Sequence, residues 1–437
     1  MAKTTAKKNI GASPQRNYNP IHWIANILRR WKNLKPSEGL FGLGLLGLWI
    51  FLLGGSLYKT TFNFKLDATV RSLDFTYTGD HDQGLFNEIS DLKALTIQGQ
   101  IDNDLVLNGT FRAPDNPELV PVLQDLDQLT LKLNTFDSQL TLTTPQAKTQ
   151  YPLSLLTLNI TPNTRVEALT YSPKSRNLSL NLCRPTTSTS TCGTFQDIPT
   201  EAVAPSEATD QPPLPHSQLE LQTGSGPLQL VIDFGDIPEL RDTLIESDTV
   251  LPDQLTLLFT PTELSASDPH VLELGHYTQI KTTVPKPDDA IDPDTGDQRP
   301  WLNQDLTVSK LALSRYTEAA EASAAVYTST ILKGSATGPT GKSIKLDRQQ
   351  FLILDDGPGV EKVRSLQINT KDPQGIQILA SGKTNQLATG LYTDAPLQSI
   401  TQPWLTQYLS EFQIGGIIGF ISSLTLFFLP RILDDDD

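Results

Sequence analysis

One glycine-rich segment has the residue types of a phosphate-binding loop. ATGPTGKS, from Ala336 to Ser343, fits a relaxed form of that loop, with alanine in place of its first glycine. FLILDD, from Phe351 to Asp356, resembles the apolar run whose aspartate holds magnesium. A phosphate-binding loop is followed by a helix whose N-terminus faces the phosphates. Only seven residues separate the two segments, and Ile344 and Leu346 alternate there as in a strand. The pattern favours a glycine-rich hairpin turn, so we expect neither a bound nucleotide nor another cofactor.

An acidic segment, DPDTGD, is the one candidate for a metal site. Asp292, Asp294 and Asp297 could turn their carboxylates toward a hard cation such as calcium. The segment departs from the calcium-binding loop of EF-hands because Gly296 precedes Asp297 and no glutamate follows at the bidentate position. An acidic, solvated loop is therefore the favoured interpretation, with calcium binding as the alternative.

The chain has two cysteines, Cys183 and Cys192, which enclose the eight residues RPTTSTST. An even pair this close in sequence, outside the cytoplasm, predicts a small disulfide-closed loop. Closing such a loop would stabilise the fold by roughly 2 to 3 kcal/mol in the entropic model. Two free thiols are the alternative in a reducing compartment. The spacing does not fit a CxxC redox or zinc motif.

Catalytic patterns are missing from the sequence. It contains no HExxH motif, no paired histidine spacing and no G-x-S-x-G elbow. We therefore expect a protein that is not an enzyme, and the alternative is a hydrolase whose site forms only in the folded chain. The five histidines are His22, His81, His216, His270 and His276.

Two long apolar stretches without charge lie near the ends of the chain. They run from Leu40 to Tyr58 and from Phe412 to Pro430. Each approaches the ~20 residues with which an α-helix crosses the hydrocarbon core of a bilayer. We therefore predict transmembrane helices at residues 39–58 and 404–430, the second with an interfacial lead-in. A secretory signal peptide is the alternative for the first stretch, although its apolar core would have only ~7 to 15 residues.

Charge predicts the orientation of these spans. Residues 1–38 carry eight Lys and Arg against a single acid, and such a segment normally stays in the cytoplasm. The acidic tail, residues 431–437, would return to the cytoplasm. Residues 59–411 would then face the periplasm of a bacterial plasma membrane or the lumen of a thylakoid-type membrane. Their net charge is about −19 by formal count, which repels phosphate backbones, so we expect no nucleic-acid partner.

Two groups of residues are predicted to lie at the membrane–water interface. The segment from Asn19 to Leu34 has an apolar stripe and a basic end, as in a helix that lies in the plane of an anionic leaflet. Aromatic residues just before the second span suit an interfacial belt. The interfacial residues are Ile21, Ile24, Leu28, Arg29, Arg30 and Trp31 in the first group, and Trp404 and Tyr408 in the second.

The second apolar stretch also carries a face of small residues. Gly415, Gly419 and Ser423 recur every four residues and therefore share one side of a helix. Small side chains let another backbone approach closely. The pattern predicts a packing face whose partner is either the first span or a different membrane protein.

The region between the two stretches has the alternation of β-strands. Apolar residues occupy every second position from Phe62 to Val70, and the phase then slips by one residue, as at a β-bulge. Two further alternating runs, Leu95–Ile101 and Leu105–Phe111, flank Asp-Asn as in a hairpin. One apolar and one polar face per strand favours antiparallel sheets stacked as sandwiches. We therefore predict a mainly β chain.

An internal repeat suggests that this β region is duplicated. Asp115–Leu119 (DNPEL) matches Asp236–Leu240 (DIPEL), and Asp127–Leu131 (DQLTL) is identical to Asp253–Leu257. The blocks keep their order, which favours duplication over chance. We predict β-sandwich-like domains at residues 59–183 and 218–403, joined by a Pro/Ser/Thr-rich linker at 184–217.

These features together predict a two-pass, membrane-anchored accessory or scaffold subunit of a bacterial membrane complex. Its expected partners are the lipid bilayer and other membrane-protein subunits. A carrier or binding protein for envelope lipid or glycan is the first alternative. Glycan-binding platforms usually expose aromatic side chains, and the region between the spans has only Trp301 and Trp404 as tryptophans, which favours lipid.

Two resemblances exist at the level of architecture alone. Two terminal spans around an extracytoplasmic region resemble the layout of polysaccharide co-polymerases, although those ectodomains are largely helical. The leucine-alternating strands resemble the β-jelly rolls of envelope lipid carriers. Architecture without shared site residues does not establish function.

Overall fold

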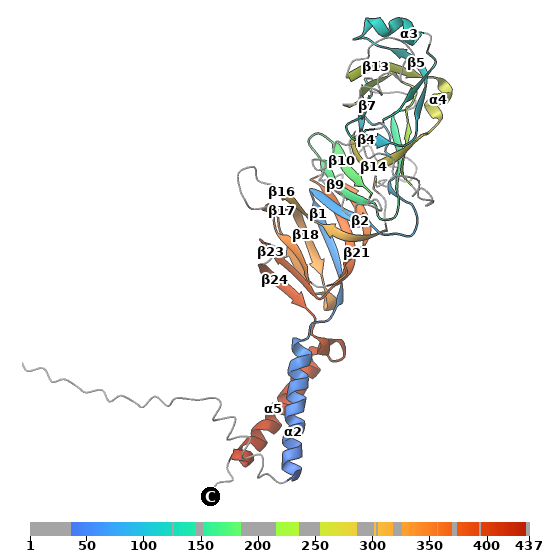
Figure 1. The fold of residues 1–437 in the computed structure, drawn as a ribbon. Coiled ribbons are helices and arrows are strands. Elements are labelled where there is room, and N and C mark those ends of the chain that lie inside the picture. Colours follow the sequence, from blue (N-terminus) through green and yellow to red (C-terminus); the bar gives the residue numbers. More distant parts are fainter. Residues whose placement is uncertain are drawn as a thin grey trace, which may run out of the picture. The chain divides into compact units, whose positions relative to one another are not determined.

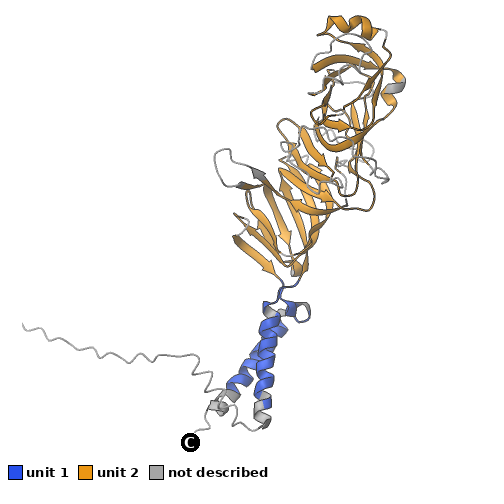
Figure 2. Ribbon diagram, viewed as in Figure 1, with its two compact units in different colours: residues 1–60, 402–437 blue, residues 61–401 orange. Residues whose placement is uncertain are grey.

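The structure of the chain is a computed structural model, and it forms two compact units (Figure 2). Unit 1 combines Met1–Thr60 with Gln402–Asp437, and unit 2 is Thr61–Thr401. The structure describes residues 36–124, 126–133, 135–145, 152–184, 216–235, 254–285, 301–302, 305–317, 326–355, 357–368, 374–392 and 395–433. The predicted interfacial helix with Ile21, Ile24, Leu28, Arg29, Arg30 and Trp31, and the acidic segment with Asp292, Asp294 and Asp297, lie outside the described residues.

Unit 1 is helical, and its elements come from both ends of the sequence (Figure 1). It contains α2 (Pro36–Leu57), the 3₁₀ turn η5 (Trp404–Gln407) and α5 (Glu411–Leu433). The two helices therefore cover most of the two apolar stretches of the sequence. Within the described part of the chain, no helix combines the length and the apolar character needed to cross a membrane.

Unit 2 is mainly β with antiparallel ladders, as the alternation in the sequence predicts. Nineteen strands in its described residues belong to one hydrogen-bonded sheet system. They are β1 (Phe62–Val70), β2 (Ser72–Tyr77), β3 (Gln83–Phe86), β4 (Ala94–Ile101), β5 (Leu105–Arg112), β6 (Gln128–Leu131), β7 (Gln139–Thr143), β8 (Ser154–Ile160), β9 (Arg165–Ser172), β10 (Asn177–Cys183), β11 (Ser217–Gln222), β12 (Leu228–Asp233), β13 (Gln254–Pro261), β14 (His270–Thr283), β15 (Leu306–Ala312), β18 (Ile331–Thr337), β19 (Ser343–Leu346), β21 (Gly359–Ile368) and β22 (Ile376–Thr384).

Two smaller sheets and four short helical segments complete the described part of unit 2. The small sheets are β16 (Ser314–Thr317) with β17 (Val326–Ser329), and β20 (Phe351–Asp355), β23 (Gln386–Gly390) and β24 (Pro396–Thr401). The helical segments are η1 (Pro117–Leu119), α3 (Val120–Gln124), α4 (Glu263–Ser267) and η4 (Pro339–Gly341). Large side chains fill the core between the strands, and the largest that are fully buried are Phe64, Phe75, Phe86, Phe234 and Phe259.

The phase slip after Val70, predicted from the sequence as a β-bulge, coincides with a break between two strands, and the β1–β18 ladder also has a register irregularity between Thr69 and Val70. β1 ends at Val70 and β2 begins at Ser72, so only Arg71 separates them. β1 then pairs with β18 and β22, whereas β2 pairs with β9 and β15. The slip occurs because the chain passes from one set of partner strands to another, and each strand keeps its own apolar face.

Strand pairing joins the two sides of the Pro/Ser/Thr-rich segment at residues 184–217. β14 pairs with β4, β10 and β11, β13 pairs with β5, and β12 pairs with β7. Strands from residues 59–183 and 218–403 therefore share ladders, and all of them belong to the same compact unit. In the described residues, the β structure does not separate at this segment into one sheet before it and one after it.

Candidate functional site

The glycine-rich segment that resembles a phosphate-binding loop forms the predicted hairpin turn. β18 and β19 pair antiparallel, with Thr337 opposite Ser343. Between them, Gly338 N–H donates to the carbonyl oxygen of Lys342 over 2.8 Å, and Gly341 adopts a φ of +76°, which favours glycine. A strand rather than a helix follows the turn, so no helix N-terminus is available there for phosphate groups.

Cys183 is the last residue of β10, and its side chain is buried. Its sulfur is bonded rather than present as a free thiol. The predicted partner, Cys192, lies outside the described residues. The loop closed by these two cysteines therefore stays a prediction.

The small-residue face of α5 makes no contact with α2 in the described residues. A Cβ atom placed on Gly415 or Gly419 would meet no other atom within 4 Å. Ser423 Oγ donates to the carbonyl oxygen of Gly419, one turn earlier in the same helix, over 2.8 Å. All three residues are exposed. Of the two partners that the sequence allowed, this arrangement leaves the face open to a different chain, and docking there stays a prediction.

α2 and α5 pack through large side chains instead. Leu52 of α2, Leu405 of η5 and Ile421 of α5 form a buried apolar cluster. Trp49 Nε1 donates to Thr425 Oγ1 over 3.2 Å and so adds a polar contact between the two helices. Polar contacts of this kind, together with close packing, hold helix pairs together in an apolar environment.

Aromatic rings gather where α2 ends and η5 begins. The ring of Trp404 lies 5.7 Å from that of Phe51 and 5.2 Å from that of Tyr408, measured between centroids. Tyr58 and Tyr408 are 68% and 70% exposed. The two residues predicted from sequence for a membrane–water interface, Trp404 and Tyr408, are therefore in one aromatic cluster, with polar tips that can reach water.

Sequence patterns did not reveal a cleft in unit 2, which we call the α3 cleft. It has a volume of about 460 Å³ and lies where α3 crosses the end of β5 beside β13. The sequence places the helical segment there because Pro117 occupies its first turn and the buried side chains of Leu119 and Leu123 anchor it. The residues that line the cleft are Thr110, Phe111, Arg112, Ala113, Pro114, Val120, Leu123, Gln124, Leu126, Asp127 and Leu258.

The α3 cleft has apolar walls and a polar rim. Phe111 is buried and its ring stacks on Phe259, with centroids 5.1 Å apart and planes 14° apart. Val120 and Leu258 remain 39% and 36% exposed. The exposed side chains of Arg112, Gln124 and Asp127 supply the longest polar groups of the lining. Polar and apolar atoms contribute about equally to the exposed lining of the cleft, and its volume falls within the range of small-molecule sites.

A second polar arrangement surrounds Asp74 on β2. Its Oδ1 accepts a hydrogen bond from the backbone N–H of Ala168 over 2.6 Å. Ala168 has a φ of +50°, which is strained for a residue with a side chain, and it lies in an irregular stretch of the β2–β9 ladder. Nearby, Arg165 and Glu167 form an ion pair at 2.9 Å.

Burial shifts the titration of this cluster. It raises the pKa of Asp74, against the lowering effect of the Ala168 hydrogen bond and of two arginines. Burial also raises the pKa of Glu167, and the charge of Asp74 adds to that rise. The pKa of Tyr277 is raised to about 12, first by burial and then by Glu167. Within the described ranges, no three His, Cys, Asp or Glu side chains are placed to share a metal ion.

Asp74→Asn is expected to leave the protein at least as stable as the unmodified chain at neutral pH. The amide oxygen still accepts the Ala168 hydrogen bond, and the cost of burying a charge disappears. Asp74→Ala should cost about 1–3 kcal/mol because that N–H loses its acceptor. Urea unfolding of the three proteins measures the difference.

The sign of the pH dependence follows from the raised pKa of Asp74. The Asp74 carboxyl binds its proton more tightly in the folded state than in the unfolded state. Protonation of Asp74 therefore contributes fully to the free energy of unfolding below the unfolded pKa of about 4, and this contribution is lost as the pH rises through the folded pKa. The advantage of Asp74→Asn should therefore shrink as the pH falls toward 4. If Asp74→Asn lost as much stability as Asp74→Ala at neutral pH, this interpretation would be contradicted.

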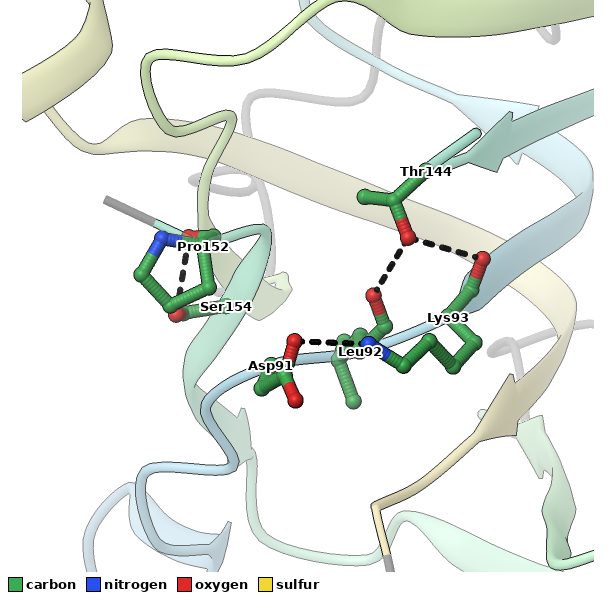
Figure 3. A network of polar contacts seen from close by, with 6 residues as sticks. All are labelled: Asp91, Leu92, Lys93, Thr144, Pro152 and Ser154. Atoms are coloured by element: carbon green, nitrogen blue, oxygen red, sulfur yellow. Dashed lines mark hydrogen bonds and ion pairs between the residues drawn. The ribbon is translucent and has the colours of Figure 1, made fainter. Parts of the chain in front are cut away.

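A third polar network supports the structure around the start of β4 (Figure 3). Thr144 Oγ1 donates to the carbonyl oxygens of Leu92 and Lys93, over 3.1 and 3.3 Å. Lys93 Nζ pairs with Asp91 over 2.8 Å, and Ser154 Oγ donates to the carbonyl oxygen of Pro152 over 3.1 Å. These bonds satisfy backbone carbonyls beside the buried Leu92, which is a structural role.

Comparison with known proteins adds no family to these observations. The chain matches no protein-family model, and no curated protein is similar to it. The grounds for assigning a function are therefore the side chains of the two helices, the α3 cleft and the patterns of the sequence.

Proposed function

We propose that this protein is a membrane-anchored, non-enzymatic accessory or scaffold subunit. In this proposal α2 and α5 lie in a bilayer, and unit 2 is displayed in the periplasm or in a thylakoid-type lumen. The two termini remain on the cytoplasmic side. The observation that carries the proposal is the set of large apolar side chains that both helices expose.

These exposed side chains would be unfavourable in water. Each buried side chain of this kind gains about 1.5–3 kcal/mol over an exposed one, and a contiguous apolar surface of this extent marks a site of protein or membrane contact. The sequence adds that Leu40–Tyr58 and Phe412–Pro430 contain no charge. The exposed residues are Leu40, Leu43, Leu46, Leu48, Ile50, Phe51, Leu53, Leu57 and Tyr58 on the first helix and its end, and Phe412, Ile418, Phe420, Leu426 and Phe427 on the second.

The scaffold part of the proposal rests on the face formed by Gly415, Gly419 and Ser423. In the described residues the α2–α5 contact uses other side chains, and in this proposal the face receives a helix of a partner subunit. Interfaces between membrane helices favour small residues because they allow the backbones to approach closely.

A second function is favoured by the α3 cleft. A carrier or binding protein for envelope lipid needs an apolar cavity that opens to water, and the cleft has apolar walls and a polar rim. This function is compatible with membrane anchoring but does not require a partner subunit. The two proposals therefore differ in what should accompany the purified protein.

Native mass spectrometry of the intact protein, gently extracted from its own membrane, separates the two functions. The scaffold function predicts a complex with defined protein subunits. The carrier function predicts a monomer or small homo-oligomer with discrete lipid masses. A bare monomer without either addition would count against both.

A further inference from the structure

We propose that the α3 cleft binds a single-chain amphiphile and that Arg112 pairs with its anionic head group. The proposal deepens the carrier function and rests on it. Membrane anchoring by α2 and α5 is a separate matter, because those helices belong to the other unit. The ligand class follows from the two halves of the cleft, one apolar and one polar.

The apolar half fits an acyl chain. The volume of about 460 Å³ falls within the range of sites for small molecules. Val120 and Leu258 keep more than a third of their surface exposed, and they are apolar side chains of the lining that a ligand can cover. An acyl chain would remove this apolar surface from water, which is favourable by roughly 25 cal/mol per Å².

The polar half fits an anion. Arg112 is the only basic residue among those that line the cleft, and it forms no ion pair in the part of the chain that the structure describes. A guanidinium offers parallel N–H donors that match a carboxylate or a phosphate. Gln124 adds an amide that can donate to the same head group. The carboxylate of Asp127 lines the same cleft and repels an anion, so the head group is expected to lie on the side of Arg112 away from Asp127.

Backbone pairing fixes the relative positions of the two halves. Arg112 of β5 lies opposite Leu258 of β13 in the ladder that joins these strands. Arg112, which would bind the head group, and Leu258, which belongs to the apolar half, are thus neighbours on adjacent strands, with their Cα atoms about 5 Å apart. Opposite residues of an antiparallel ladder share a face, so a ligand that pairs with Arg112 can extend over Leu258.

Photolabelling of the full-length protein in lipid nanodiscs tests the proposal. The probes are palmitic acid with a diazirine in its chain and the matched hexadecanol, which lacks the charge. Labelled peptides are identified by mass spectrometry. Palmitate should label peptides that contain Val120–Leu126 or Leu258, in addition to any lipid-facing peptides of α2 and α5.

Two substitutions and one control variant test whether the labelling is specific to the cleft. Arg112→Gln should lower palmitate labelling of the cleft by about threefold to fivefold, the loss expected for a solvent-exposed ion pair, and should change hexadecanol labelling less than twofold. Leu258→Trp, which fills the apolar half, should lower both. Arg348→Gln, at an exposed arginine in the turn before β20, should change neither.

The outcomes separate this inference from the anchoring role. Labelling confined to α2 and α5 would overturn the cleft proposal and leave membrane anchoring intact. An equal effect of Arg112→Gln on both probes would overturn the role of Arg112. Competition by unlabelled palmitate or by lysophosphatidic acid would support an anionic ligand. The stronger competitor would show whether the site prefers a carboxylate or a phosphate head group.

Discussion

Replacing Gly415 and Gly419 together by leucine is expected to release the partner subunits while the chain itself stays folded. The new side chains would occupy the face at which another backbone is predicted to approach. Among the described residues, a Cβ atom at either position meets no atom within 4 Å outside its own stretch of helix, so the first side-chain atom of each leucine has room. The effect should therefore appear in co-purification from mild detergent, with the partner band reduced at least tenfold.

Two controls show whether the loss is specific to this face. Phe420→Leu introduces the same side chain at an exposed position of the same helix and should retain the partner. Gly55→Leu should instead disturb the packing inside unit 1, because a Cβ there would lie 2.8 Å from Leu405. Unchanged co-purification of the Gly415→Leu/Gly419→Leu protein would contradict docking through this face.

Leu46→Lys is expected to weaken membrane association strongly. Leu46 is half exposed and lies well inside the uncharged stretch Leu40–Tyr58. A lysine near the centre of a membrane helix costs about 2.5–3.5 kcal/mol on the insertion scale, which is a change of roughly a hundredfold in partition. The measurement is the fraction of full-length protein that remains in membranes after an alkaline carbonate wash, made in a Phe420→Lys background so that α5 does not retain the protein by itself.

Leu57→Lys is the matched control for this prediction. Leu57 is 79% exposed and is the last residue of α2, so a lysine there can extend its ammonium group into the headgroup region at little cost. In the same background it should remain in the washed membranes like the Phe420→Lys protein. Equal retention of both variants in that background would mean that α2 does not lie in the bilayer.

The local structure of the chain was largely predictable, because it depends on neighbouring residues. Alternation from Phe62 to Val70 predicts β1, whose side chains are in turn buried and exposed. The glycines between β18 and β19 predict a turn because they tolerate the backbone angles that it requires. The uncharged stretches predict α2 and α5 in the same way, within a few residues at each end.

Partner strands were not predictable in this way. The runs that became β4 and β5 look like a hairpin in the sequence, yet β4 pairs with β7 and β14, and β5 pairs with β6 and β13. Every apolar-faced strand is a suitable partner for every other, so alternation alone does not select among them. For the same reason, the repeat at Asp115–Leu119 predicts a similar local segment but not which sheet it joins.

The α3 cleft and the cluster around Asp74 could not be predicted from the sequence for a related reason. Arg112 and Leu258 lie far apart in sequence and meet only through the β5–β13 ladder. Asp74 and Glu167 likewise come from strands that only the fold brings together. In the sequence, each of these residues is an ordinary member of an alternating strand, without a motif around it.

The alkaline carbonate wash of membranes that carry the unmodified full-length protein tests the central claim most directly. Peripheral proteins are released by the wash, whereas proteins with helices in the bilayer stay with the lipid. The account predicts that the protein remains in the membrane pellet and leaves it only when detergent is added. Recovery of the intact protein in the wash would contradict membrane anchoring by α2 and α5.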